Sequence, residues 1–189
     1  MDISQTVAAH IGKTLVDLGA RYCFGVIGTA NFKVTHALIE SGIHYVAARH
    51  EGNAATMADA YAKATGELTL LSVHSGPGLT NALTGIGETA KSRTPLLVLA
   101  GDVPVGGVTS NCYFDQAEMA RSVGAVSERV YAPHTALNDT VRAVTRAMRD
   151  RQTVVLSLPI DVQDAQLPAG VTAPQMPLPV SYRAGCCSH

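Results

Sequence analysis

One carboxylate in the chain is placed where it could move a proton inside a protein. Glu51 lies between an apolar run at residues 45–48 and a stretch of small, largely apolar residues at 52–62. This order predicts a strand-to-helix junction with the carboxyl group in a nearly water-free position. Burial raises a carboxyl pKa by up to about 3–5 units, so such a group could share a proton with a ring nitrogen of a ligand. The alternative is a solvated glutamate that the helix dipole favours at a helix start.

Three further junctions of the same kind carry glycine or polar groups. They lie at residues 24–31, 73–81 and 100–104, each at or just after the end of an apolar run. Glycine lets a ligand approach the backbone, and the helix that follows offers free N–H groups. Ligands collect outside the carboxyl ends of parallel strands, so we expect the four loops to face one crevice. The glycines match neither G-x-G-x-x-G nor G-x-x-x-x-G-K-[ST], which disfavours a nicotinamide-binding or P-loop domain. For any single glycine, a tight turn is the simpler explanation.

The elements that must position these loops alternate along the chain. Apolar runs predict strands at residues 22–26, 44–47, 68–73, 96–100, 129–131 and 153–158. Helical periodicity predicts helices at residues 4–19, 31–41, 52–65, 79–91, 116–121 and 135–150, the first with Ser4 as its N-cap. The strands at 68–73 and 96–100 are almost wholly apolar, as expected of strands covered on both faces. The alternation predicts an α/β fold, a doubly wound parallel sheet with helices on both faces.

Composition disfavours several classes of protein. The net charge is −1 and only 15% of the residues are charged, which disfavours a nucleic-acid binder or a polybasic membrane protein. The sequence shows no membrane-spanning apolar run and no leader pattern. Its four cysteines lack metal-binding spacing, so we expect a cytoplasmic protein. The length suits one domain at residues 1–165, followed by a Pro-rich linker or tail at 166–189.

Several short motifs occur in the order in which one enzyme family carries them. They are Phe-Gly-Val-x-Gly at 24–28, Arg-His-Glu at 49–51, Met-Ala-Asp-Ala-Tyr-Ala at 57–62, Ser-Gly-Pro-Gly-Leu-Thr-Asn at 75–81, Thr-Gly-Ile at 84–86, Thr-Pro-Leu-Leu-Val-Leu-Ala-Gly at 94–101 and Leu-Pro-Ile-Asp-Val-Gln at 158–163. Over residues 1–165 the chain resembles the N-terminal, pyrimidine-binding domain of thiamine-diphosphate enzymes of the acetolactate synthase type. The resemblance implies a sheet of six parallel strands.

The resemblance implies that Glu51 is the cofactor-activating glutamate. In that role its carboxyl group hydrogen-bonds N1′ of the aminopyrimidine and can give it a proton. Further cofactor contacts are expected at Gly25, Ile27, Gly28, Thr29, Ser75, Gly76, Pro77, Asn81 and Gln116. The last position departs from the family, whose Gln directly follows the Phe that matches Phe114, where this chain has Asp115. Either Gln116 takes over through a shift of one residue, or the substrate chemistry differs.

His74 is a second departure. Many acetolactate synthases have Thr before the Ser-Gly-Pro-Gly segment, whereas benzoylformate decarboxylase is similar to this chain in carrying His-Ser there, with a His that moves protons. In that comparison Thr29 falls where the decarboxylase places an active-site Ser. A histidine titrates near neutral pH, which suits proton transfer. The alternative is a His74 that only hydrogen-bonds a neighbouring loop.

The resemblance also implies partners that this sequence does not contain. Family members hold the cofactor diphosphate through Mg in a C-terminal domain marked by Gly-Asp-Gly, and acetolactate synthases bind FAD in a middle domain; the sequence has no Gly-Asp-Gly. We therefore expect the chain to bind only the pyrimidine half of thiamine diphosphate, to be inactive alone, and to form homo- or hetero-oligomers with a diphosphate-binding domain. Two alternatives stay open: a subunit of a split, benzoylformate decarboxylase-like 2-keto acid decarboxylase, and a non-catalytic binding or assembly module.

Overall fold

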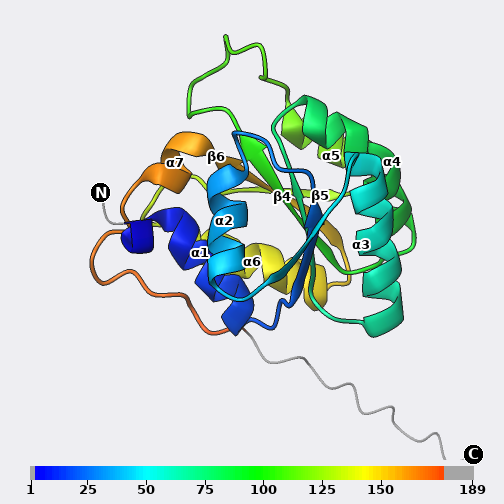
Figure 1. The fold of residues 1–189 in the computed structure, drawn as a ribbon, viewed down its shortest axis with the longest axis horizontal. Coiled ribbons are helices and arrows are strands. Elements are labelled where there is room, and N and C mark those ends of the chain that lie inside the picture. Colours follow the sequence, from blue (N-terminus) through cyan, green and yellow to red (C-terminus); the bar gives the residue numbers. More distant parts are fainter. Residues whose placement is uncertain (1–2, 177–189) are drawn as a thin grey trace, which may run out of the picture.

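Six parallel strands form one sheet at the centre of the molecule (Figure 1). The computed structural model describes residues 3–176. The strands are β1 (Tyr22–Gly25), β2 (His44–Ala47), β3 (Thr69–Val73), β4 (Leu96–Asp102), β5 (Val126–Arg129) and β6 (Thr153–Pro159). Their order across the sheet is β2-β1-β3-β4-β6-β5, and every neighbouring pair is parallel. The predicted six-stranded parallel sheet is confirmed.

Helices cover both faces of this sheet, as predicted. One face carries α1 (Val7–Asp17), α2 (Phe32–Glu40), α6 (Ala136–Met148) and α7 (Ile160–Asp164), and the other carries α3 (Glu51–Thr65), α4 (Pro77–Lys91) and α5 (Gln116–Ser122) (Figure 1). The chain leaves β1 towards one face and the adjacent β3 towards the other. Loops that diverge in this way open a crevice at the carboxyl edge of the sheet, which is the upper side of the molecule in Figure 1.

Three elements differ from the sequence prediction. The first helix begins at Val7, after a 3₁₀ turn at Ile3–Gln5, and its N-cap is Thr6 rather than Ser4. The backbone of Thr6 is extended because it forms an antiparallel bridge with Gln166, so the helix starts only after it. The fifth strand is β5, three residues before the predicted 129–131, where it pairs with β6. The short α7 was not predicted, because five residues are too few to show a helical period.

Two layers of apolar side chains fix the helices to the sheet. Ile11, Leu38 and Leu97 belong to the layer under α1, α2 and α6, and another layer lies under α3, α4 and α5. Within the second layer α3 and α4 approach so closely that a Cβ atom on Gly85 would lie 2.5 Å from the Cβ of Ala55. The two helices that begin at the crevice are therefore in direct contact.

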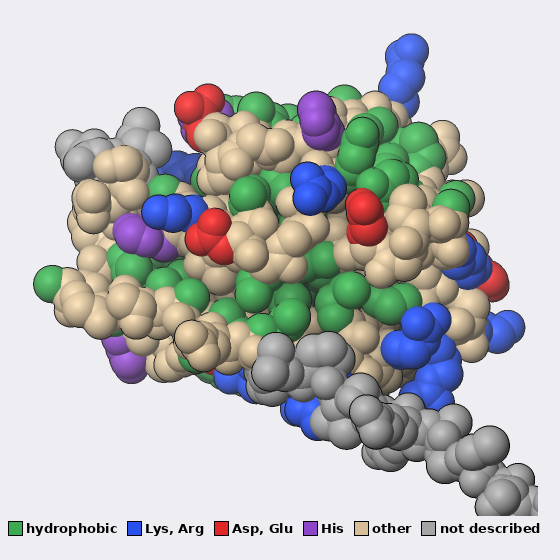
Figure 2. Space-filling model, turned by 90° about the horizontal axis from the view of Figure 1, so that it is seen from below, with side chains coloured by type: hydrophobic (Ala, Val, Ile, Leu, Met, Phe, Trp, Pro, Cys, Tyr) green, Lys and Arg blue, Asp and Glu red, His purple; other side chains and the backbone are tan. Residues whose placement is uncertain are grey.

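The segment after the last helix returns across the α1 face. Leu167, Val171 and Met176 pack against the core under α1, so the described part of the predicted linker is attached to the domain. Residues 177–189, the rest of that linker, lie outside the described residues. On the face shown in Figure 2, side chains of both charges are scattered among hydrophobic and polar ones, in keeping with the small net charge. Within 3–176 no helix has the length and hydropathy needed to cross a membrane.

Candidate functional site

The loop between β1 and α2 lies tightly against the end of β3. A Cβ atom on Gly25 would lie 2.3 Å from the carbonyl oxygen of Ser72, so only glycine lets β1 pass the neighbouring strand here. Beyond Gly25 the turn exposes Ile27 and Thr29 and half-buries Gly28. The structure thus brings four of the predicted residues to the carboxyl edge of the sheet.

The end of β3 provides the second wall of the crevice. His74 is half-buried, and a Cβ atom on Gly28 would lie 2.8 Å from its Cγ, so the imidazole packs closely against the β1 turn. Its Nδ1 lies 3.3 Å from the hydroxyl of the buried Ser75. Gly76 has a φ of 54°, in the left-handed region that favours glycine, and serves as N-cap of α4, which starts at the exposed Pro77.

Glu51 is the first residue of α3, which follows β2. Its Oε2 accepts a hydrogen bond from Nδ2 of Asn81 in α4, at 3.0 Å. The N-cap is His50, whose Nδ1 accepts from the backbone N–H of Gly52 at 3.0 Å. A carboxylate at this end is favoured by the helix dipole. Glu51 is half-buried, so the described residues alone do not give it the water-free position that the sequence predicts.

The segment before α5 differs from what the resemblance implies. Asp115 is the N-cap of α5 and accepts from the backbone N–H of Glu118 at 2.9 Å, so it is occupied with capping. Gln116 is buried, and its Nε2 donates to the carbonyl oxygen of Gly101 at 3.2 Å. Its side chain lies inside the domain, under the ends of β4 and β6, rather than on the crevice beside Glu51. Phe114, by contrast, is exposed and its ring reaches the backbone of Gly76.

A polar cavity of about 220 Å³ lies beneath that segment. Asp102, at the end of β4, is almost fully buried there and forms an ion pair with Arg129 at the end of β5. Burial raises the pKa of the Asp102 carboxyl above its usual range, while the Arg129 guanidinium and the backbone N–H of Val103 act in the opposite direction. The cavity therefore holds a carboxylate that is costly to ionise.

The pH dependence of stability should report on this carboxylate. Because the pKa is raised in the folded state, the native protein binds more protons than the unfolded chain in the window above 3.8, and the free energy of unfolding falls as the pH rises through it. Asp102→Asn should flatten this fall, because the titrating carboxyl group is gone. Arg129→Met should extend the fall to higher pH, since the cation that lowers the pKa is gone. Urea unfolding over a pH series measures both effects, and identical pH profiles for all three proteins would contradict the prediction.

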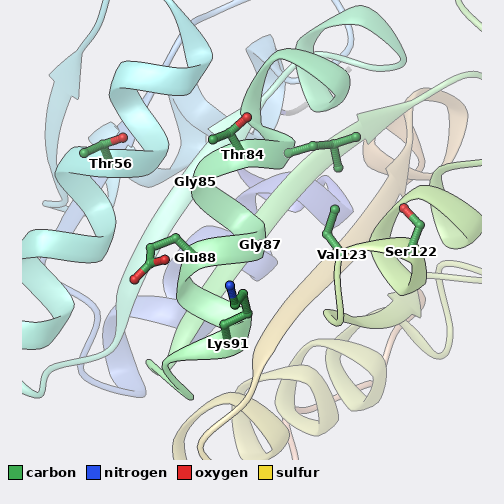
Figure 3. Close-up of a pocket in the computed structure, with 9 residues that line it drawn as sticks. Thr56, Thr84, Gly85, Gly87, Glu88, Lys91, Ser122 and Val123 are labelled. Carbon is green, nitrogen blue, oxygen red and sulfur yellow. The ribbon is translucent and has the colours of Figure 1, made fainter.

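A second hollow lies away from the predicted site. It is a groove of about 730 Å³ between α3, α4 and the end of α5, lined by residues that include Thr56, Glu88, Lys91 and Val123 (Figure 3). None of the site residues that were predicted from the sequence lines this groove. The candidate site is therefore the carboxyl edge of the sheet and not this groove.

Large hydrophobic side chains are exposed on the loops that follow β1 and β4. Ile27 is 46% exposed, and Val105, Val108, Tyr113 and Phe114 are exposed as well. Exposed hydrophobic groups gathered in one region mark an interaction surface. The edge that carries Glu51 and His74 is thus suited to being covered by another protein surface or a ligand.

Two buried amides that hold these loops were not singled out by sequence. Asn31 lies beneath the β1 turn and is fully buried. Gln163 donates through Nε2 to the carbonyl oxygens of Ala30 and Leu158, both at 2.8 Å, and thereby ties α7 to the start of α2. Gln163 occurs in one of the recurring motifs, but nothing in the chain order shows that its partner lies 133 positions earlier.

The fold and the edge site define an open parallel α/β domain whose glycine turns and polar side chains gather at the ends of β1, β2 and β3. A family model described as thiamine pyrophosphate enzyme, N-terminal TPP binding domain, matches residues 5–125. The chain belongs to this family. The structure agrees, since it has the parallel sheet of the fold and brings the glycine turns and Glu51 to one edge.

Relatives with several activities share this domain. The chain is 43% identical over 97 residues to the acetolactate synthase isozyme 3 large subunit of Escherichia coli, and the match covers 51% of the chain and 17% of that protein. It is 32% identical over 173 residues to the acetolactate synthase large subunit of Lactococcus lactis, with 88% and 30% covered. It is 32% identical over 172 residues to a probable 2-ketoarginine decarboxylase of Pseudomonas aeruginosa, with 86% and 30% covered. The chain thus spans less than a third of the length of these relatives.

Proposed function

We propose that this chain supplies the pyrimidine-binding half of a thiamine-diphosphate site in an acetolactate synthase-like enzyme that acts on 2-keto acids. The observation that carries the proposal is the position of Glu51. It stands at the start of α3, at the carboxyl edge of the sheet, and is held by Asn81 of the neighbouring helix. The family and the names of its relatives support a thiamine-dependent enzyme.

The residues around Glu51 suit a flat heterocycle. Gly25, Gly28 and Gly76 let the turns pack closely against the neighbouring strand and loops, since a Cβ atom at any of them would lie within 3 Å of another atom of the domain. Ile27 offers an exposed apolar side chain beside them. We expect Thr29 and Ser75 of the two turns, together with Pro77 and Asn81 of α4, to complete the cradle. Gln116 is buried under the Phe114 segment and serves to support it from within.

Glu51 has the task of holding a proton opposite a ring nitrogen. When bound, thiamine diphosphate supplies the nucleophilic carbon that attacks a 2-keto acid. Full cover of this edge by another domain would exclude the remaining water from the Glu51 carboxyl group. The exposed hydrophobic side chains at this edge support such a cover. Within residues 3–176 no group of three or more acidic, His or Cys side chains is suited to hold a metal ion. We propose that the diphosphate, Mg and any FAD are held by other domains or subunits.

A decarboxylase is the second candidate, favoured by His74. Its imidazole lies at the crevice, and its Nδ1 lies within hydrogen-bonding distance of the Ser75 hydroxyl. The other ring nitrogen, Nε2, does not take part in that bond. An imidazole at this position could transfer a proton to a product. Which of the two activities applies is decided by product analysis of the assembled enzyme: a coupled product from two 2-keto acids indicates the synthase, and an aldehyde indicates the decarboxylase.

The proposal is tested by supplying the missing half of the site. The chain is titrated with thiamine diphosphate and Mg by calorimetry, alone and mixed with the C-terminal region of the Lactococcus lactis relative. We expect the mixture to bind the cofactor at least tenfold more tightly than either component alone, because the cofactor would then be held at both ends. Equal binding with and without this chain would refute the proposal and favour a non-catalytic assembly module.

A further inference from the structure

The buried side chain of Asn31 holds the β1 turn from below. Asn31 is 0% exposed, and its Oδ1 accepts a hydrogen bond from the backbone N–H of Gly28 at 2.8 Å. Its Nδ2 donates to the carbonyl oxygen of Val26 at 3.1 Å and to the hydroxyl of Ser72 at 2.9 Å. One amide thus bonds both ends of the turn and the neighbouring strand β3.

Each polar side chain of this buried network has a hydrogen-bond partner. The hydroxyl of Ser72 also lies 2.8 Å from that of Thr35 in α2, and all three side chains are fully buried. Buried polar groups that are all paired specify one arrangement, because any alternative leaves a donor or acceptor without a partner. Asn31 therefore ties the turn to β3 in addition to the backbone bond from the Val26 N–H to the Ser72 carbonyl oxygen at 3.3 Å. The Thr35 hydroxyl bonds to Ser72 and not to the turn.

The position of the β1 turn determines the position of the His74 side chain. The imidazole of His74 packs against Gly28, where no room remains for even a Cβ atom. A displacement of Gly28 therefore either opens a gap beside the ring or pushes it aside. We propose that Asn31 is a positioning residue, which fixes the β1 turn and, through Gly28, the orientation of the His74 imidazole at the crevice. The importance of this orientation for chemistry rests on the proposed function.

The test uses two variants of the same buried network in the full chain. Asn31→Ala removes the bonds to the turn, whereas Thr35→Val removes one bond to Ser72 at an equally buried position and leaves the turn untouched. The ring signals of His74 are read by ¹H–¹³C NMR, assigned with His74→Gln, and hydrogen exchange is read at the Gly28 amide. In Asn31→Ala we expect displaced His74 signals and Gly28 exchange faster by about tenfold, the effect of one lost hydrogen bond. In Thr35→Val both should stay as in the wild type.

Unchanged His74 and Gly28 signals in a folded Asn31→Ala would overturn the proposal, and so would equal changes in Thr35→Val. Asn31→Ser, which keeps a polar group in the buried position but is too short to reach the turn, gives the same test if the alanine variant does not fold. No cofactor takes part in these measurements. If the chain mixed with the C-terminal region fails to bind thiamine diphosphate while His74 responds to Asn31, the proposed function falls and the positioning role stands.

Discussion

Replacement of Glu51 by Gln is expected to abolish the exchange of the C2 proton of thiamine diphosphate in the assembled enzyme. Glutamine has the same shape and keeps an oxygen that can accept from Asn81, so the start of α3 should keep its structure. It has no ionisable proton to hold opposite the ring nitrogen. Loss of a positioned acid or base lowers a rate by roughly 10²–10⁴-fold, and exchange measured by NMR in ²H₂O should slow by that factor.

Glu40→Gln is the matched control for this experiment. Glu40 is an exposed residue at the end of α2, on the amino side of the sheet, so the same chemical change there should leave the exchange rate unaltered. Binding of the cofactor should be retained in both variants, which separates a loss of proton transfer from a loss of the site. Wild-type exchange in Glu51→Gln would remove Glu51 from the proposed role.

Gly25→Ala should strongly destabilise the domain, although it adds only one methyl group. The added Cβ would lie 2.3 Å from the carbonyl oxygen of Ser72 and 2.9 Å from the hydroxyl of Tyr45. The first of these atoms belongs to the backbone of β3, which cannot turn away as a side chain can. The strands must separate, and we expect a loss of about 3 kcal/mol in the free energy of unfolding, the upper range for overpacking.

Gly87→Ala is the same chemical change in an open position. A Cβ on Gly87 in α4 would meet its nearest neighbour, the Cβ of Val123, at 3.5 Å, an ordinary contact. Alanine is the better helix former by about 0.8–1.0 kcal/mol, so this variant should be as stable as the wild type or more so. Urea unfolding of both variants gives the comparison. A Gly25→Ala protein as stable as the wild type would show that β1 and β3 can separate at little cost.

Much of the fold could be predicted because its signals are local. The apolar runs of β3 and β4 and the helical period of α6 lie within single segments, and each appears close to where the pattern predicts it. The position of Thr6 as N-cap could not be predicted, because it depends on a bridge to Gln166, far along the chain. The register of β5 depends likewise on β6, a strand that comes later in the sequence.

The site could be predicted only in part, for the same physical reason. Glu51 and His74 follow apolar runs, and the carboxyl ends of parallel strands meet at one edge, so their neighbourhood could be inferred. The direction of a side chain could not. Gln116 and Phe114 are two residues apart, yet one is buried and the other exposed, because the N-cap at Asp115 turns the chain into α5 between them. Asn31 gives no signal beyond preceding a helix, since its partners come from the β1 turn and from β3.

The contact between Gly85 and Ala55 has a consequence for how the domain tolerates change. Because α3 and α4 touch through such small groups, we expect them to move as one unit. Glu51 and Asn81, which are hydrogen-bonded to each other, lie near the N-terminal ends of these two helices. A bulkier residue at Gly85, about one turn after Asn81, would push α3 and α4 apart. The Glu51 carboxylate would then be displaced without any contact between the new residue and a ligand. Substitutions well outside the crevice could therefore change how Glu51 and Asn81 are placed relative to one another.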